Sequence, residues 1–214
     1  MRKKVRGVIL ISGSGSTMEN LLVKAAQGAC LLEPTAVIAS KTGIPGILKA
    51  QQHGVPVHVV NRKDFTDAVA FSRQIFKHVQ DLRPDVVLLA GFLSYLHLPA
   101  VYKGRVLNIH PSLLPKFGGK GMYGIKVHQA VLKAGEKETG CSVHYVDEEY
   151  DHGPIILQRK VDVLPDDTPE TLQARVMEAE CEAYPEAVNL YAEKRLLQVA
   201  QSVRILPIKA GAVD

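Results

Sequence analysis

The sequence predicts an α/β fold: a mostly parallel, twisted sheet of about seven strands, with helices on both faces and an antiparallel C-terminal extension. Short apolar runs rich in Val, Ile and Leu recur along the chain and predict buried strands. Stretches with the helical spacing of apolar residues lie between these runs, and this alternation is typical of a parallel sheet. The last two predicted strands follow each other closely, which predicts antiparallel pairing.

Length, composition and charge narrow the classes of function. The 214 residues are enough for one domain with a substantial core, and contents of 46% hydrophobic and 22% charged residues are those of an ordinary soluble protein. The net charge of +4 comes from scattered basic residues, so we expect a local anion site but no nucleic-acid partner. No apolar stretch approaches the roughly 18 residues of a membrane-spanning helix. Three cysteines without a CxxC pair, Cys30, Cys141 and Cys181, indicate free thiols in a reducing, cytoplasmic compartment.

The first elements are a strand at residues 8–11, a glycine loop S-G-S-G-S-T and a helix at residues 18–26. Basic residues precede the apolar run, but it is short and glycines follow, so a strand is favoured over a signal peptide. Free backbone N–H groups at the positive end of a helix suit a phosphate, and the hydroxyls of Ser14, Ser16 and Thr17 add donors. Met18 stands where a dinucleotide loop has its third glycine, so a monophosphate is favoured. The alternative is a tight turn with a Ser or Thr cap and no ligand.

The alternation of strands and helices continues to residue 91. We expect strands at residues 35–39, 55–60 and 85–91, a short helix around residues 47–50, and an amphipathic helix at residues 65–82 capped by Asp64 or Thr66. Pro56 indicates that the strand 55–60 lies at an edge of the sheet. The apolar loop at residues 92–98 either walls a pocket for a flat ring or covers the core.

The segment R-V-L-N-I-H-P-S-L-L-P, residues 105–115, contains a suggestive pair of polar residues. Its apolar residues predict a strand, whose period of two puts Asn108 and His110 on one face near the carboxyl end. An Asn side chain can donate to an oxygen that gains negative charge, and His can carry a proton near neutral pH. They are candidate catalytic residues. The alternative is a strand-end turn in which both side chains cap backbone groups.

The second half of the chain begins with the glycine-rich segment F-G-G-K-G-M-Y-G at residues 117–124, which is either a lid or a surface loop. We expect a helix at residues 125–134, strands at 141–146 and 155–163, and a long helix from the D-D-T-P-E signal to about residue 190, which Pro185 bends or divides. From about residue 203 the tail is weakly patterned and is expected to pack loosely. The whole pattern is Rossmann-like, and such sheets bind ligands at the carboxyl ends of their strands.

The acidic loop D-E-E-Y-D-H-G-P, residues 147–154, supplies a partner for His110. A carboxylate beside an imidazole fixes the ring and favours its charged form. Among the acids of this loop we choose Asp151, because it stands where the loop turns into a strand. The alternative is a solvated acidic loop. His144, in the middle of a strand, is predicted to be a core or supporting histidine, and no metal site is expected.

The chain closely resembles the folate-dependent formyltransferases in six segments: I-S-G-S-G-S-T, P-D-V-V-L-L-A-G-F-L, G-R-V-L-N-I-H-P-S-L-L-P, S-V-H-Y-V-D, Y-D-H-G-P-I-I and R-V-M-E-A-E-C-E-A-Y-P. Together they span residues 8 to about 195. N-I-H-P-S-L-L-P is shared across the superfamily and does not identify the substrate. The early glycine loop, the E-x-x-x-Y-P segment and the absence of an added domain select the glycinamide ribonucleotide branch.

The resemblance implies roles for individual residues. The catalytic trio is Asn108, His110 and Asp151. The loop that binds the substrate phosphate matches Gly15, Ser16 and Thr17, and the carboxylate that binds the substrate matches Glu180. The folate ring is expected to lie beside Asn108. One side of its site is a wall that matches Leu93, Ser94, Tyr95 and Leu96, and a loop that matches Val146, Asp147 and the residues up to Tyr150 closes over the ring.

The resemblance also implies a function. A formyl group passes from the co-substrate 10-formyltetrahydrofolate to the amine of 5-phosphoribosyl-glycinamide in de novo purine biosynthesis. These two small molecules are the expected partners of a monomer or homodimer, with no metal, no nucleic acid and no membrane. The implied organisation is a single formyltransferase domain, 1–214, with a phosphate-binding half at 1–100, a catalytic and folate-binding half at 101–200 and a tail at 201–214.

The chain departs from the family pattern in two places. Residues 117–127 are longer and richer in glycine than usual, although His128 still falls on a family histidine. The family's folate-binding arginine falls on Ala68, and Arg62 or Lys63 are the available substitutes. Two rival functions remain open: hydrolysis of the formyl group, and a catalytically silent sensor of folate or phosphosugar.

Overall fold

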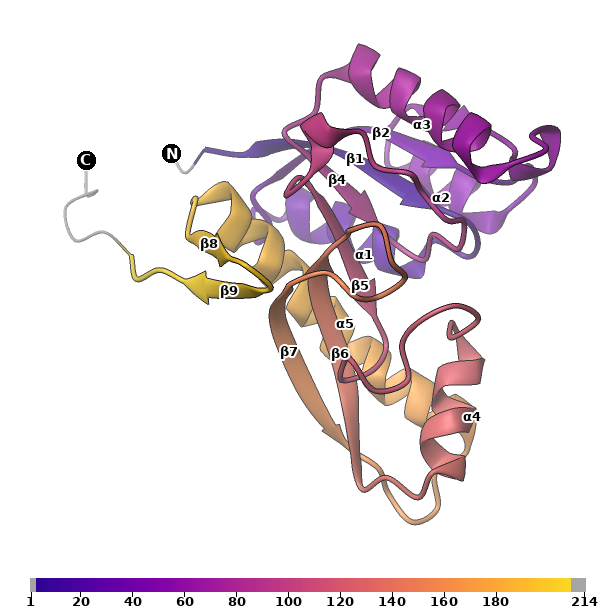
Figure 1. The fold of residues 1–214 in the computed structure, drawn as a ribbon, viewed down its shortest axis with the longest axis vertical. Coiled ribbons are helices and arrows are strands. Elements are labelled where there is room, and N and C mark those ends of the chain that lie inside the picture. The colour runs from indigo at the N-terminus through magenta and orange to yellow at the C-terminus, as the bar shows by residue number, and fades with distance from the viewer. Residues whose placement is uncertain (1–2, 209–214) are drawn as a thin grey trace.

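The computed structural model describes residues 3–208, and its centre is a seven-stranded sheet in the order β3-β2-β1-β4-β5-β6-β7 (Figure 1). The strands are β1 (Val5–Ile11), β2 (Leu32–Ala39), β3 (Val57–Val59), β4 (Val86–Leu89), β5 (Val106–His110), β6 (Glu138–Tyr145) and β7 (Ile155–Asp162). The first five pair in parallel, whereas β6 runs antiparallel to both β5 and β7. The predicted fold class is confirmed, including the antiparallel extension.

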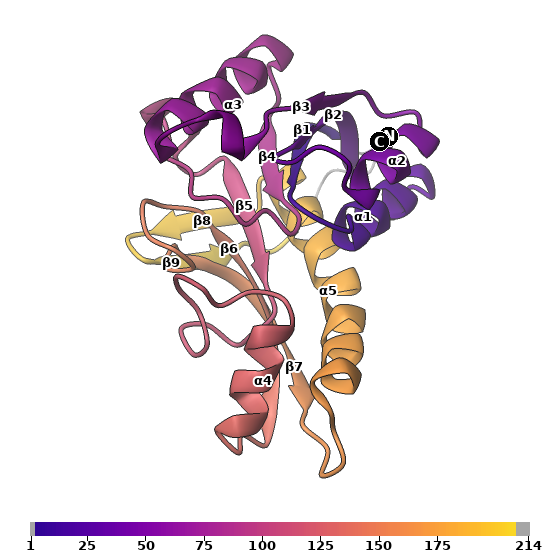
Figure 2. The ribbon, with the colours of Figure 1, turned by 90° about the vertical axis from the view of Figure 1, so that its right-hand side faces the viewer.

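Helices cover both faces of this sheet, as Figure 2 shows. They are α1 (Ser16–Ala26), α2 (Pro45–Gln52), α3 (Ala68–Leu82), α4 (Ile125–Lys133) and α5 (Pro169–Ala192), with short 3-10 turns η1 (Arg62–Asp64) and η2 (Ala100–Tyr102). Alternate residues of β1 enter opposite cores: Ile9 and Ile11 join the core of α1 and α5, whereas Val8 and Leu10 join that of α3. Burial on both faces explains why β1 reads as one apolar run. Within residues 3–208, no helix combines the length and apolar character needed to cross a membrane.

Two helices differ in detail from the sequence-based expectation. α3 begins at Ala68 rather than near residue 65, because Asp67 caps it by accepting a 2.8 Å hydrogen bond from the Ala70 N–H. The expected caps Asp64 and Thr66 lie ahead of the helix. α5 is capped by Thr168 of the D-D-T-P-E signal, where Asp167 was the alternative cap, and it continues through Pro185 to Ala192 as one helix. Pro185 is buried in the packed face of α5, and this packing offsets its missing N–H.

The C-terminal tail is the element that the sequence pattern missed. The chain forms a hairpin of β8 (Leu196–Val199) and β9 (Ser202–Ile205), drawn in yellow beside the sheet in Figure 1, and most of β9 falls in the tail that was expected to pack loosely from about residue 203. Both strands are short and largely exposed, so they lack the alternation of buried residues by which a strand is recognised. Residues 209–214 of the predicted tail lie outside the described residues.

The sheet topology creates the place for a site. β1 lies between β2 and β4, so the strand order reverses there, and connections leaving the carboxyl ends on either side diverge into a crevice. The fully buried Tyr184 of α5 fastens this helix next to the crevice. Its hydroxyl donates to the carbonyl oxygens of Leu107 on β5, at 2.9 Å, and Leu89 on β4, at 3.1 Å.

Candidate active site

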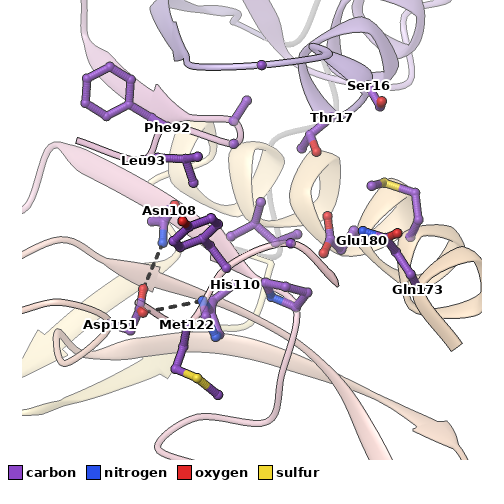
Figure 3. Close-up of a pocket in the computed structure, with 18 of the residues that line it drawn as sticks. Ser16, Thr17, Phe92, Leu93, Asn108, His110, Met122, Asp151, Gln173 and Glu180 are labelled. Carbon is purple, nitrogen blue, oxygen red and sulfur yellow. Dashed lines mark hydrogen bonds and ion pairs between the residues drawn. The ribbon is translucent and has the colours of Figure 1, made fainter. Parts of the chain in front are cut away.

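A cavity of about 310 Å³ opens at the carboxyl ends of β1, β4 and β5 (Figure 3). The loop after β1 lines one side of it, and the end of β5 and the glycine-rich segment line the other. Figure 3 shows Thr17 and Glu180 on one side and Asp151 on the other, with Asn108 and His110 between them. The predicted phosphate loop and the predicted catalytic residues therefore share one cavity.

The loop after β1 places the start of α1 at this cavity. Gly15 is the residue before α1 and has φ 73, a left-handed conformation that suits glycine. A Cβ on Gly15 would lie 2.7 Å from the Cα of Gly46, at the start of α2, so the loop is closely packed there. Among the described residues no side chain caps α1, which leaves N–H groups of its first turn, with Ser16 and Thr17, available to an anion.

Asn108, His110 and Asp151 come together at the far side of the cavity. His110 Nδ1 lies 3.4 Å from Asp151 Oδ2, and Asn108 Nδ2 lies 3.4 Å from Asp151 Oδ1. The first two side chains leave the same face of β5, as the period of two predicts, and Asp151 reaches them from the loop between β6 and β7. Asp151 has φ 54, which is strained for a residue with a side chain and tends to occur at functional sites.

His144 on β6 supports this group from behind. Its Nδ1 donates to the carbonyl oxygen of Tyr145 at 2.8 Å, so its Nε2 is free to accept the 3.0 Å hydrogen bond from Asn108 Nδ2. Burial lowers the pKa of His144, which keeps the ring neutral in this role. His144 is thus a supporting histidine that orients the Asn108 amide, in agreement with the expectation from its position.

The glycine-rich segment also contacts His110 and Asp151. His110 Nε2 donates to the carbonyl oxygen of Phe117 at 2.8 Å, and the Gly119 N–H donates to Asp151 Oδ2 at 2.9 Å. Met122 and Tyr123 of the same segment line the cavity. Sequence reasoning missed these contacts, because two of them use backbone atoms that leave no signature in the residue types.

α5 contributes a buried acid to the opposite wall. Glu180 is 6% exposed, and burial raises its pKa to about 8. Gln173 and Met177 line the cavity from the same helix, at the i, i+4, i+7 spacing that puts three residues on one face. Given Glu180 as a site residue, this spacing would have predicted from the sequence that Gln173 and Met177 also line the cavity.

His128 of α4 is a further residue of this cavity. It is 1% exposed, and its Nδ1 has no hydrogen-bond partner among the described residues. Burial, with a smaller effect of nearby His110, lowers its pKa to about 4, so the ring is neutral at physiological pH.

The residues predicted to bind folate line a second, smaller cavity of about 60 Å³. Ser94, Tyr95, Leu96, Val146 and Asp147 border it together with Asn108 and Asp151, whereas Leu93 lines the larger cavity. Pockets for small ligands are typically about 300 to 1,000 Å³, so we expect the loop at residues 146–151 to move when a bicyclic ring enters. The Tyr95 hydroxyl holds that loop by donating to the Glu148 carbonyl oxygen at 2.6 Å.

The family's folate-binding arginine is replaced by Ala68, and the two residues considered as substitutes, Arg62 and Lys63, do not line either cavity. Arg62 donates to the carbonyl oxygen of Phe65 at 2.8 Å and lies over the ring of Phe71, and Lys63 lines neither cavity. Among residues 3–208, no group of three or more His, Cys, Asp or Glu side chains is arranged to hold a metal ion.

Comparison with known proteins identifies the family. The profile of the family described as formyl transferase matches residues 5–188, which is more than half of the chain. The chain belongs to the formyl transferase family. The resemblance inferred from the motifs is confirmed at this level.

Relatives of this formyl transferase include single enzymes and parts of longer proteins. The phosphoribosylglycinamide formyltransferase of Haemophilus influenzae is 35% identical over 190 residues, which cover 88% of this chain and 87% of that protein. The trifunctional purine biosynthetic protein adenosine-3 of Drosophila pseudoobscura pseudoobscura is 39% identical over 210 residues. That match covers 96% of this chain but 15% of the fly protein, so the chain spans a small part of such relatives.

Solved structures of the formyl transferase family share the fold. Glycinamide ribonucleotide transformylase 1 of Symbiobacterium toebii has a TM-score of 0.89 and 35% identity, and the match covers 95% of each chain. A formyltetrahydrofolate deformylase of Pseudomonas syringae has a TM-score of 0.84 and 26% identity, over 96% of this chain and 67% of that one. The fold is thus shared by proteins named for transfer and for hydrolysis.

Proposed function

We propose that this formyl transferase moves a formyl group from 10-formyltetrahydrofolate to the amine of 5-phosphoribosyl-glycinamide, a step of de novo purine biosynthesis. The observation that supports this most is that an anion-binding loop and the Asn-His-Asp group line the same cavity. Relatives named phosphoribosylglycinamide formyltransferase support the choice of acceptor. Because the chain covers a small part of the trifunctional relatives, we propose only formyl transfer for it and none of the other activities of those proteins.

In the proposed reaction the substrate amine attacks the formyl carbon, and the new C–N bond turns the formyl oxygen into an oxyanion. Asn108 and protonated His110 donate to this oxygen, each donor being worth about 3 to 4 kcal/mol at such a site. The amine then gives up a proton with the help of Asp151. The bond from the formyl carbon to folate N10 breaks as N10 takes a proton that His110 relays.

The larger cavity is assigned to the phosphosugar substrate. Its phosphate binds at Gly15, Ser16 and Thr17, where N–H groups and hydroxyls converge at the start of α1. Glu180 accepts hydrogen bonds from donors between the phosphate and the amine, since it lies across the cavity from Asp151. Holding the substrate at both ends turns the encounter of amine and formyl carbon into a local event.

The folate ring is assigned to the second cavity. Asn108 and Asp151 line both cavities, so the formyl carbon lies where the two meet. Leu93 faces the junction from the larger cavity, and Ser94, Tyr95, Leu96, Val146 and Asp147 surround the ring once the loop has opened. No metal takes part in the proposed reaction. We propose the cytoplasm as its location, where buried thiols such as Cys30 and Cys141 stay reduced.

A steady-state assay with both substrates tests the proposal. His110→Ala should lower kcat about a thousandfold, because it removes a proton carrier and an oxyanion donor, while both ligands still bind in calorimetry. His53→Ala, an exposed histidine at the end of α2, is the control and should keep full activity. A wild-type protein that binds both ligands and never transfers the formyl group would instead support the sensor function.

Hydrolysis is the second candidate, because a deformylase shares the fold. The anion-binding loop argues against it, since a hydrolase acting on folate alone has no phosphosugar to hold. Deformylation of 10-formyltetrahydrofolate is therefore measured with and without glycinamide ribonucleotide. Turnover should depend on the amine, and turnover at the same rate without it would exclude the transferase assignment.

A further inference from the structure

His110 is held at its two ring nitrogens by different partners. Nδ1 faces Asp151 Oδ2 at 3.4 Å, on the side where Asn108 also approaches the Asp151 carboxylate. Nε2 lies on the other side of the ring, 2.8 Å from the carbonyl oxygen of Phe117. The imidazole is 4% exposed, so water cannot readily replace either partner.

The partner of Nε2 determines which nitrogen carries a permanent hydrogen. A carbonyl oxygen can only accept a hydrogen bond, so Nε2 must be protonated to bind Phe117. The hydrogen that the ring can gain or lose is then the one on Nδ1. We propose that the Phe117 carbonyl fixes the proton on Nε2 and thereby makes Nδ1 the nitrogen through which His110 exchanges a proton during turnover. Proton exchange during turnover rests on the proposed function, whereas the position of the proton on Nε2 does not.

The position of Nδ1 suits this task. Asp151 and Asn108, which Nδ1 faces, line both the larger cavity and the second cavity, so this side of the ring is next to their junction. The other titratable neighbours of His110 are His128 and His144, and burial lowers the pKa of both, so they remain neutral. Asp151 is therefore the acidic side chain that faces Nδ1, and its carboxylate can accept a hydrogen bond from this nitrogen when the nitrogen carries a hydrogen.

The backbone around Phe117 is built to make these contacts. Phe117 has φ 54, a left-handed conformation that costs energy for a residue with a bulky side chain. A Cβ on Gly118 would lie 2.5 Å from Leu114 Cδ2 and 3.2 Å from Asp151 Cβ. The next residue, Gly119, donates its N–H to Asp151. This three-residue segment thus contacts His110 through Phe117 and Asp151 through Gly119, with Gly118 packed closely between them.

Ser112 is the positioning residue for this segment. It is fully buried, and its hydroxyl donates to the Lys116 carbonyl oxygen at 2.6 Å, directly before Phe117. The Ser112 carbonyl oxygen is itself held by the Ser142 hydroxyl of β6 at 2.6 Å. The turn that presents the Phe117 carbonyl is therefore tied to the sheet, and loss of the Ser112 hydroxyl should let this carbonyl move away from His110.

The first test is a spectrum of the unliganded protein. Proton–nitrogen correlation spectra of the protein with isotope-labelled histidine distinguish the two neutral tautomers, and the His110 signals are identified by their absence in His110→Ala. We expect the Nε2–H tautomer, with Nδ1 as the nitrogen whose signal responds to pH. A Nδ1–H tautomer in the wild-type protein would overturn the proposal.

The second test links the tautomer to turnover. Ser112→Ala should lower kcat about five- to tenfold, leave both KM values within about twofold, and introduce a population of the Nδ1–H tautomer. Thr35→Val is the matched control, because it removes a hydroxyl that donates to the Gly7 carbonyl oxygen at 3.0 Å, away from the cavities. It should change neither kcat nor the tautomer.

The outcomes separate this inference from the proposed function. If Ser112→Ala keeps the wild-type tautomer and kcat, the positioning role is wrong. If wild type shows the Nε2–H tautomer but transfers no formyl group, the proposed function fails and the tautomer assignment stands.

Discussion

At the scale of single residues, Glu180 is an ionisable group in an environment that disfavours its charge. Burial raises the pKa of Glu180 from 4.5 to about 8. In the unfolded chain this acid loses its proton near its ordinary pKa, whereas the folded protein holds the proton until higher pH. The fold is therefore progressively destabilised from about pH 4.5 to about pH 8, by about 1.4 kcal/mol for each unit in which the two states differ.

We predict that Glu180→Gln stabilises the unliganded protein at pH 8 and has little effect near pH 4.5. The amide keeps the shape of the acid but has no proton to lose, so the pH-dependent penalty disappears. Urea unfolding at both pH values measures the difference. Glu178→Gln, exposed on the same helix, is the control and should have little effect at either pH. An equal gain at both pH values for Glu180→Gln would contradict the prediction.

A second residue-scale prediction concerns Gly15. Gly15→Ala should raise the KM for the phosphorylated substrate and destabilise the protein, because its Cβ would lie 2.7 Å from the Cα of Gly46. Gly28→Ala is a matched control: φ is 75 at Gly28 and 73 at Gly15, but a Cβ at Gly28 meets no atom within 4 Å. Both variants share the cost of a left-handed alanine, about 1 to 2 kcal/mol. If KM changed equally in the two variants, the effect would be due to backbone strain and not to the phosphate loop.

At the scale of elements, the loop at residues 146–151 borders the second cavity, which we assign to folate. This cavity is about 60 Å³, and the loop is fastened to the opposite wall by the Tyr95 hydroxyl, which donates to the Glu148 carbonyl oxygen. The rings of Tyr95 and Tyr150 also lie 5.3 Å apart, which adds a contact between wall and loop. We expect opening of the cavity to break this hydrogen bond and to separate these rings.

Tyr95→Phe should therefore free the loop without removing the ring contact. We expect backbone amides of residues 148–151 to exchange with solvent about fivefold faster, since one hydrogen bond contributes about 1 kcal/mol. Tyr102→Phe is the control, because that ring packs against Phe76 in the α3 core and lies outside the loop. Unchanged exchange in Tyr95→Phe would show that the loop is held by its other contacts.

At the scale of the whole molecule, the candidate site spans the crevice where the strand order reverses. A ligand that contacts both α1 and β5 binds the folded chain and not the unfolded one, so it stabilises the entire fold. We predict that glycinamide ribonucleotide at about 100 times its Kd stabilises the protein by about 2.7 kcal/mol. The analogue without the phosphate, at the same concentration, should stabilise it much less. Equal stabilisation by both in thermal unfolding would exclude the loop at Gly15 as the phosphate site.

The sequence was sufficient to predict most of the sheet and to predict that the side chains of Asn108, His110 and Asp151 lie together. Apolar runs predicted β1, β4 and β5, and the alternation within β5 put Asn108 and His110 on one face. Asp151 was predicted as the partner of His110 from its place at the end of a loop, and the structure brings His110 Nδ1 to 3.4 Å from Asp151 Oδ2. Side-chain patterns report burial and spacing, which is why they succeed for elements of this kind.

The features that the sequence did not predict have physical reasons. The Phe117 carbonyl and the Gly119 N–H are backbone groups, so any residue type could supply them. The hairpin of β8 and β9 has little buried surface, so its apolar residues show no periodic pattern. The cap of α3 fell on Asp67 because three neighbouring polar residues offer similar caps and the backbone decides among them.

The hydroxyl of Tyr184 has a mechanical consequence for the enzyme. Tyr184 and Glu180 are one helical turn apart on α5, and the Tyr184 hydroxyl is fixed to the backbone of β4 and β5. Glu180 and the neighbouring strands β4 and β5 are therefore held together by hydrogen bonds from the same helix. Under the proposed function, ligands of different size would be accommodated by the surrounding loops, and inhibitors that require a wider span between Glu180 and the formyl group should bind poorly.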